Sequence, residues 1–75
     1  MSINFEIIEH IGILKKYQNG WTKELNRVSW NQSNPKYDIR DWDPTHKLMT
    51  KGITLTKEEL ETLEIAIVKH LNKGV

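Results

Sequence analysis

An Asn-Gly pair at positions 19 and 20 is the feature that most constrains how this chain can fold. Asn-Gly between two alternating segments is the strongest short signal for a β-hairpin, because its residues accept the positive φ that the tight turn requires. The stretches FEIIEHIGILKKY at 5–17 and WTKELNRVSWN at 21–31 are therefore predicted to be its two strands. The first strand is expected to bury its odd-numbered apolar residues on one face: Phe5, Ile7, Ile11, Ile13 and Tyr17.

Two more strands are predicted after the hairpin. QSNP at 32–35 has turn composition, and KYDIRDW at 36–42 alternates again. One face of this third strand carries Tyr37 and Ile39, and the other carries Lys36, Asp38, Arg40 and Trp42. A polar loop, DPTHKLMTKG at 43–52, leads to a short fourth strand, ITL at 53–55.

The last segment is predicted to be a helix over 57–72. Thr56 is a favourable N-cap, and Glu59 three residues later completes a capping box. Glu58 and Glu59 also suit the positive end of the helix dipole, and Gly74 stands where a C-terminal stop is expected.

The apolar surface of this helix is wider than one small sheet requires. An amphipathic helix needs an apolar stripe roughly 100° wide, and this helix exceeds it. Its apolar residues are Leu60, Leu63, Ile65, Ala66, Ile67, Val68 and Leu71. We expect a homodimer that uses Ile65, Val68 and Leu71; the alternative is a helix sunk deeply into its own sheet.

Together these elements predict an α+β fold, β-β-β-β-α, in which the helix covers one face of an antiparallel sheet. Residues 1–75 are predicted to form a single domain. The chain has 75 residues and no cysteine, so disulfides and thiolate metal sites are excluded and oligomerisation is the remaining stabiliser. The first residues lack a signal-peptide pattern, and no apolar run reaches the length of a membrane span. We expect a cytoplasmic location, which is compatible with association with the nucleoid.

The formal net charge of +1 is unevenly distributed. Residues 15–51 hold eight basic and four acidic residues, a balance of +4, and they also contain all three tryptophans. Basic residues interleaved with aromatic residues suit a single nucleic-acid strand, because cations meet phosphates and exposed rings stack on unpaired bases. The simpler interpretation, in which the lysines are solvated and the tryptophans fill the core, stays open from composition alone.

Several motifs resemble the single-stranded-DNA-binding domain of the transcriptional positive cofactor four family, in its small bacterial and phage-type members. They are YDIR at 37–40, Trp42, KGITL at 51–55 and VSWN at 28–31, and the resemblance covers roughly 20–71. It implies a curved four-stranded sheet, a dimer formed through the C-terminal helices, and a channel for single-stranded DNA with little sequence preference.

The resemblance also implies a set of contact residues. Arg40 and Lys51 would contact phosphates, Trp42 and Trp30 would stack on bases, and Lys23, Arg27 and Lys36 would add basic contacts. These 75 residues do not contain the Ser-rich regulatory tail of the eukaryotic members, so we do not expect transcriptional coactivation to carry over. RNA binding in place of DNA, and the process served (transcription, replication or repair), stay open.

Other classes of site have little support. Asp38 and Asp41 fall on opposite strand faces, and Asp43 precedes Pro44 as a turn former, so we expect no metal site and a pairing of Asp38 with Arg40 or a lysine. His10, His46 and His70 are scattered without ligand spacing and are expected at the surface or at an edge.

We therefore expect no catalytic residue, no cofactor, no small-molecule substrate and no membrane partner. The rival function is a protein-interaction module that binds through the apolar helix surface and exposed tryptophans. Lysines beside the tryptophans argue against it, because the core of a protein interface usually excludes Lys.

Overall fold

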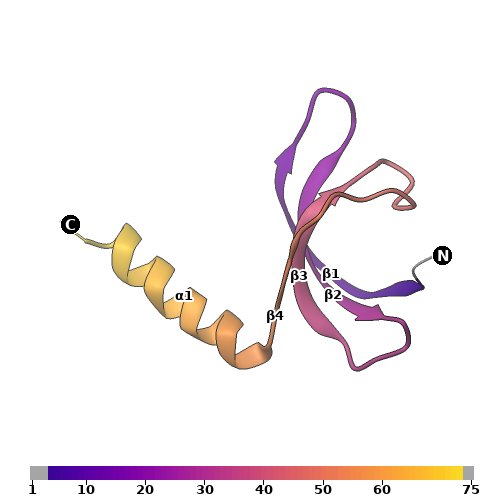
Figure 1. Cartoon of the computed structure of the whole chain (residues 1–75). Coiled ribbons are helices and arrows are strands. Elements are labelled where there is room, and N and C mark those ends of the chain that lie inside the picture. The colour runs from indigo at the N-terminus through magenta and orange to yellow at the C-terminus, as the bar shows by residue number, and fades with distance from the viewer. Residues whose placement is uncertain (1–3, 74–75) are drawn as a thin grey trace.

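The computed structural model describes residues 4–73. In this part of the chain, four strands and one helix follow in the predicted order: β1 (Phe5–Lys16), β2 (Thr22–Trp30), β3 (Lys36–Trp42), β4 (Ile53–Leu55) and α1 (Lys57–Leu71). The strands form one antiparallel sheet with the spatial order β1-β2-β3-β4, which confirms the predicted α+β fold (Figure 1). Among the described residues, no helix is long and apolar enough to cross a membrane.

The predicted hairpin joins β1 and β2. Gly20 has φ of 91°, and its amide donates to the carbonyl of Tyr17 at 3.1 Å. The Asn19 side chain accepts from the amide of Trp21 at 3.0 Å. A second tight turn joins β2 and β3, where Asn31 and Gln32 both have positive φ and the Ser33 amide donates to the Trp30 carbonyl at 2.9 Å.

The prediction that the odd-numbered residues of β1 share one face is wrong in detail, because the strand has a bulge at every third residue. The register pairs Ile7 with Val28 and Glu9 with Arg27, and similar shifts follow twice more. The residues without a partner are Ile8, Ile11 and Leu14. A bulge adds one residue to one strand and increases its bend and twist. β1 therefore repeats with a period of three, and His10 rather than Ile11 shares a face with Ile7 and Ile13.

The helix begins as its sequence predicts. Thr56 Oγ1 accepts from the Glu59 amide at 3.1 Å, and the Glu59 carboxylate accepts from the Thr56 amide at 2.8 Å, which completes the capping box. At the other end, the backbone N–H of Asn72 donates to Val68. Gly74, the predicted stop, lies outside the described residues.

The helix extends away from the sheet instead of lying flat on it (Figure 1). It has no buried residue, and Leu60 alone is half-buried. One copy of the chain therefore does not form the alternative predicted from the sequence, in which the helix is sunk deeply into its own sheet. Isolated helices of about 12–15 residues are marginal in water, so this one needs an apolar surface to rest on.

The sheet has two faces of different character. The side turned away from the helix is hollowed, and we call it the concave face (Figure 1). It carries Phe5, Ile7, His10, Ile13, Glu24, Asn26, Val28, Trp30, Lys36, Asp38, Arg40 and Trp42. The opposite side, the helix face, carries Lys23, Leu25, Arg27, Tyr37, Ile39 and Asp41. As predicted, Ile39 faces the helix while Arg40 and Trp42 face away from it.

Candidate nucleic-acid interface

Trp42 is the centre of the core and not an exposed base-stacking residue. Its side chain has no exposed surface. The Phe5 ring lies 5.2 Å from it, and the His46 ring stacks on it at 5.7 Å with an interplanar angle of 28°. The predicted role for Trp42 therefore needs correction: the curved sheet and the 43–50 loop cover its ring, and no base can reach it in this conformation.

Arg40 is held in an ion pair, as the sequence suggested. Its Nε lies 2.6 Å from Asp38 Oδ1, and a terminal nitrogen donates to Asp38 Oδ2 at 2.7 Å. Asp38 is fully buried, and the Arg40 side chain is 13% exposed. The guanidinium also lies 4.4 Å over the Trp30 ring. Most of its donors are thus occupied within the protein, and its main effect is to fix Trp30 and Asp38.

Gly52 permits this arrangement of Arg40. A Cβ on Gly52 would lie 2.3 Å from the Ile39 carbonyl oxygen and 2.4 Å from Arg40 Cβ. Real Cβ atoms do not approach other atoms so closely, and one of the two atoms is backbone. Gly52 of the Lys-Gly motif thus lies where the chain comes so close to β3 that a side chain would not fit.

Of the two tryptophans predicted to stack on bases, Trp30 is the one that keeps some accessible surface. It is half-buried, and its ring lies 5.9 Å from that of Phe5. Its indole N–H has no hydrogen-bond partner within the described residues. This nitrogen is itself buried, as is that of Trp42, so the part of Trp30 that a ligand can reach is its ring.

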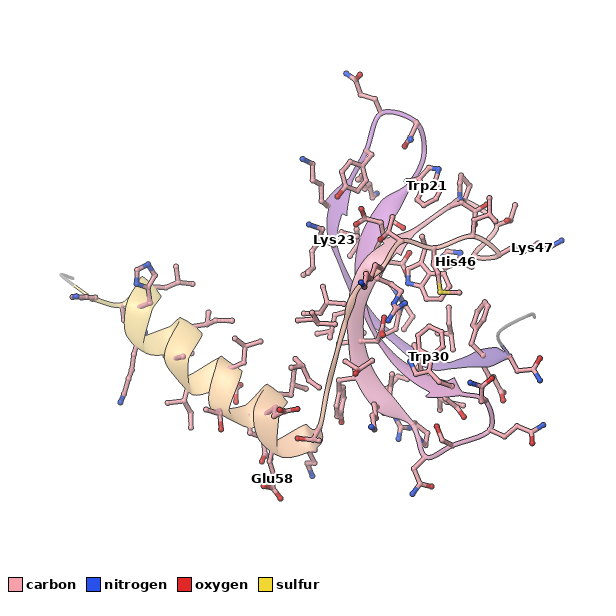
Figure 2. All side chains as sticks on the ribbon, viewed as in Figure 1. Trp21, Lys23, Trp30, His46, Lys47 and Glu58 are labelled. Atoms are coloured by element: carbon pink, nitrogen blue, oxygen red, sulfur yellow. The ribbon has the colours of Figure 1, made fainter. Side chains whose placement is uncertain are left out.

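The predicted basic residues divide between the two faces. Lys36 lies on the concave face and is exposed, and Lys51 is exposed beside β4. Lys23 and Arg27 are half-buried on the helix face, and Figure 2 shows Lys23 pointing to the helix side. Arg27 Nε lies 3.4 Å from the Glu9 carboxylate. The structure therefore does not bring these four side chains into one patch.

Two residues that the sequence analysis did not select lie on the side of the concave face. Lys47 projects from the 43–50 loop, and Trp21 lies at the hairpin end of the sheet (Figure 2). Lys47 is exposed and Trp21 is half-buried. Their position in a Trp- and Lys-rich segment was the only sequence signal that pointed to them.

The 43–50 loop is organised by Asp43. Its carboxylate accepts from Thr45 Oγ1 at 2.6 Å and from the amides of Lys47 and Leu48 at 2.9 and 2.7 Å. The Thr45 hydroxyl and these amides lower the pKa of Asp43 to about 2. Asp43 is thus a turn former, as predicted, and it fixes the position of His46.

A polar network that the sequence did not predict lies on the concave face. Glu24 is buried and accepts from Thr22, from Asn26 Nδ2 at 3.0 Å and from His46 Nε2 at 2.8 Å. Burial by itself raises the pKa of Glu24, but the hydrogen bonds from Thr22, Asn26 and His46 outweigh it and hold the pKa below its usual value. His10 joins through Asn26 Oδ1 at 2.7 Å. Two of the three histidines, expected to be scattered, therefore converge on one carboxylate.

The acidic residues of β3 do not form a metal site. Asp38 and Asp41 lie on opposite faces, as predicted, and Asp41 accepts from the Tyr17 hydroxyl at 3.1 and 3.2 Å. No group of three or more potential ligands among the described residues could hold a metal ion.

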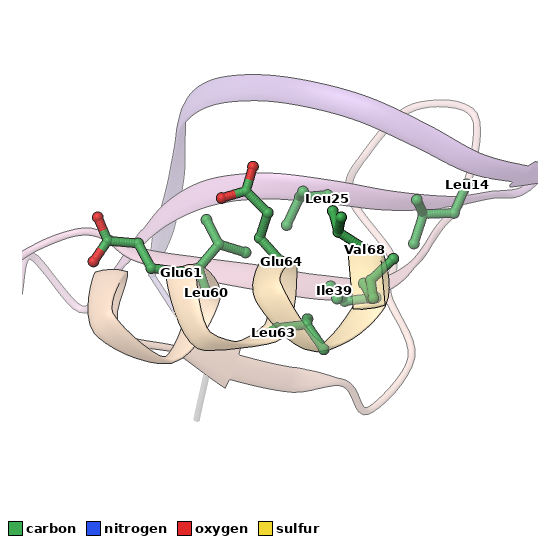
Figure 3. Close-up of a pocket in the computed structure, with 9 residues that line it drawn as sticks. Leu14, Leu25, Ile39, Leu60, Glu61, Leu63, Glu64 and Val68 are labelled. Atoms are coloured by element: carbon green, nitrogen blue, oxygen red, sulfur yellow. The ribbon is translucent and has the colours of Figure 1, made fainter. Parts of the chain in front are cut away.

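An apolar groove lies between the helix and the helix face. It encloses about 430 Å³. Figure 3 shows side chains from the sheet and from the helix lining it, and these are Leu14, Leu25, Ile39, Leu60, Glu61, Leu63, Glu64, Ile67 and Val68. Of the residues predicted for a dimer interface, Val68 lines the groove, while Ile65 and Leu71 are 57% and 69% exposed.

Comparison with known proteins agrees with the resemblance in the motifs. The family model for Transcriptional Coactivator p15 (PC4) matches residues 17–66, which include β2, β3, β4 and most of α1. The chain is also 43% identical over 60 residues to an uncharacterized protein of Treponema pallidum (strain Nichols), a match that covers 80% of this chain and 71% of the relative.

Proposed function

Because the chain belongs to the Transcriptional Coactivator p15 (PC4) family, we propose that it binds single-stranded DNA as a homodimer with little sequence preference. The family is known for single-stranded DNA binding and coactivation, which supports nucleic-acid binding in general. The observation that carries the proposal is the match over 17–66, because this segment contains the curved strands and the basic, Trp-rich stretch.

The strand would run along the concave face. This face offers the half-buried Trp30 ring, Lys36 lies exposed on it, Lys47 projects from the 43–50 loop beside it, and Lys51 is exposed next to β4. Cations that track the phosphates and an aromatic surface for unpaired bases are the two elements of single-strand recognition. Arg40 and Trp42 would act by positioning these groups: Arg40 packs on Trp30, and Trp42 fills the core behind it.

The dimer would form through the helix and the apolar groove. In one copy of the chain, α1 leaves Ile65, Ile67, Val68 and Leu71 exposed. A second helix laid against the groove would cover them and bury apolar area at about 25 cal/mol per Å². Lys23 and Arg27, on the helix face, would then border the space between the two protomers, on the side of the sheet opposite the bound strand.

A binding experiment tests this proposal. Labelled oligo-dT of about twenty nucleotides and a duplex of equal length are titrated with the protein at several salt concentrations. We expect the single strand to bind more tightly, because a duplex hides the base faces. Equal affinity for the two would contradict the proposal and indicate charge attraction alone.

Matched lysine variants locate the face that is used. Lys36→Gln and Lys51→Gln should each weaken binding and reduce the log–log salt slope by about 0.7 for each phosphate of the single strand that the variant no longer neutralises. Lys57→Gln, on the first turn of α1, is the control and should change neither quantity. An effect of Lys57→Gln as large as that of Lys36→Gln would argue against the concave face.

A further inference from the structure

A cavity on the concave face is lined by residues to which no role has yet been given. It lies between β1, β2 and the 43–50 loop, and it encloses about 280 Å³. Its lining residues are Ile7, His10, Ile13, Glu24, Asn26 and His46. This volume is just below the roughly 300–1,000 Å³ of pockets for drug-sized ligands, which suits a single small ring system.

The hydrogen bonds of the cavity fix which nitrogen of each imidazole carries its proton. A carboxylate can only accept, so His46 Nε2 is the donor in its 2.8 Å contact with Glu24. Asn26 Nδ2 donates to Glu24, which leaves its Oδ1 to accept from His10 Nδ1 at 2.7 Å. The second nitrogens, His10 Nε2 and His46 Nδ1, are therefore the acceptors of the neutral rings and become donors on protonation.

Both histidines are accessible while the carboxylate between them is not. The side chains of His10 and His46 are 50% and 39% exposed, whereas that of Glu24 is 3% exposed. Glu24 is thus fully engaged behind the two rings, and a ligand would meet the imidazole edges. The apolar side chains of Ile7 and Ile13 complete the cavity and suit the flat face of a ring better than a hydrated phosphate.

The charged groups around the two histidines come from β2, from β3 and from the 43–50 loop itself. Glu24 on β2 contacts both, and Asp38 and Arg40 on β3 stand opposite Asn26 and Glu24 in the register. Asp38 and Arg40 neutralise each other, and Asp43 is bonded within its own loop. The local formal charge therefore changes from −1 with both imidazoles neutral to +1 with both protonated.

We propose that this cavity receives one nucleobase of the bound strand and that His10 and His46 hydrogen-bond to its edge. The inference rests on the proposed single-strand binding and specifies a subsite within it. The two bases differ at the position where cytosine carries its N4 amino group and thymine its O4 carbonyl: a neutral imidazole nitrogen accepts from that amino group, and a protonated imidazole donates to that carbonyl oxygen. The base preference consequently shifts toward thymine when these imidazoles are protonated, which a lower pH favours.

The test compares oligo-dT with oligo-dC of equal length at about pH 8 and about pH 6. For the wild-type protein, the ratio of dT to dC affinity should rise by roughly fivefold between these conditions, the equivalent of one hydrogen bond. In the double variant His10→Gln/His46→Gln, which has neither imidazole of the cavity, the ratio should stay constant, and each single variant should show a smaller rise than wild type. His70→Gln, on the helix, is the matched control and should behave like wild type.

A spectroscopic measurement on the unmodified protein complements the variants, in case one of them fails to fold. The imidazole ¹⁵N signals of His10 and His46 should shift when oligo-dT binds, and those of His70 should not. Wild-type protein that binds both oligomers with a pH-independent ratio, or oligomer binding that leaves both signals unchanged, overturns the subsite and leaves the proposed function intact. Absence of binding to either oligomer at both pH values overturns the proposed function itself.

Discussion

Replacing Trp42 with alanine is expected to destabilise the protein severely. The side chain has no exposed surface and packs against Phe5 and His46. Truncating a buried tryptophan costs about 3–5 kcal/mol. A chain of 75 residues has a total stability of roughly 4–11 kcal/mol at about 0.05–0.15 kcal/mol per residue, so this single change removes a large share of it.

Thermal unfolding followed by circular dichroism measures this loss. One kcal/mol shifts the melting temperature of a domain of this size by about 4–8 °C, so Trp42→Ala should melt roughly 12–40 °C below wild type. Wild type and variant are compared at the same protomer concentration, because association would make the melting temperature depend on it. Trp21→Ala, at a half-buried position, is the control and should shift the melting temperature much less.

A conservative variant separates packing from base stacking. Trp42→Phe keeps an aromatic ring against Phe5 and should fold with a smaller loss. It should then bind oligo-dT nearly as tightly as wild type, because the base never meets the Trp42 ring. The reasoning is refuted if Trp42→Ala melts within about 4 °C of wild type, or if well-folded Trp42→Phe loses oligo-dT binding.

Three further predictions concern the ion pair, the helix and the loop. Arg40→Ala should lower the free energy of unfolding, measured in urea, by about 3–5 kcal/mol, because it leaves the buried Asp38 charge unpaired. Adding Asp38→Asn should recover part of this loss. If the effects of the two substitutions simply add, the pairing is contradicted. Replacing Ile65 and Val68 together with Lys should give monomers or unfolded chain, whereas light scattering that shows a wild-type monomer at tens of micromolar would rule out the helix-mediated dimer. The pKa of Asp43 in the folded protein is about 2, below its ordinary value of 3.8, so its stabilising contribution is complete above about pH 4 and is lost as the pH falls toward about 2. Asp43→Asn should therefore lose less stability than wild type over this interval, and equal losses in acid urea titrations would exclude the effect.

Local sequence signals were sufficient to predict the order and the approximate bounds of the strands and of the helix. The Asn-Gly turn and the Thr56–Glu59 capping box each act through hydrogen bonds between near neighbours, so their chemistry is visible in a short stretch. The pairing of Asp38 with Arg40 was accessible for the same reason, because residues two apart on a strand share a face.

The content of the concave face could not be predicted in this way. Alternation placed Trp42 on the face away from the helix correctly, but whether that face is open depends on the 43–50 loop and on the curvature of the sheet. His10 and His46 meet at Glu24 only because β1 is bulged and because Asp43 holds the loop. These contacts join residues far apart in the chain. The bulges themselves could not be predicted, because the sequence of β1 was interpreted as a regular strand in which every second residue faces the same side.

The repeated bulges of β1 also bear on how the protein avoids aggregation. β1 lies at one edge of the sheet, and its FEIIEHIGIL stretch has the β-branched composition that favours uncontrolled strand pairing between molecules. A straight edge strand would present a regular row of free backbone groups to another chain, whereas an extra residue at every third position interrupts that row. The other edge, β4, has three residues and leads directly into the helix. The bulges that curve the β1 edge and the shortness of β4 thus leave both edges of the sheet poor templates for fibril growth.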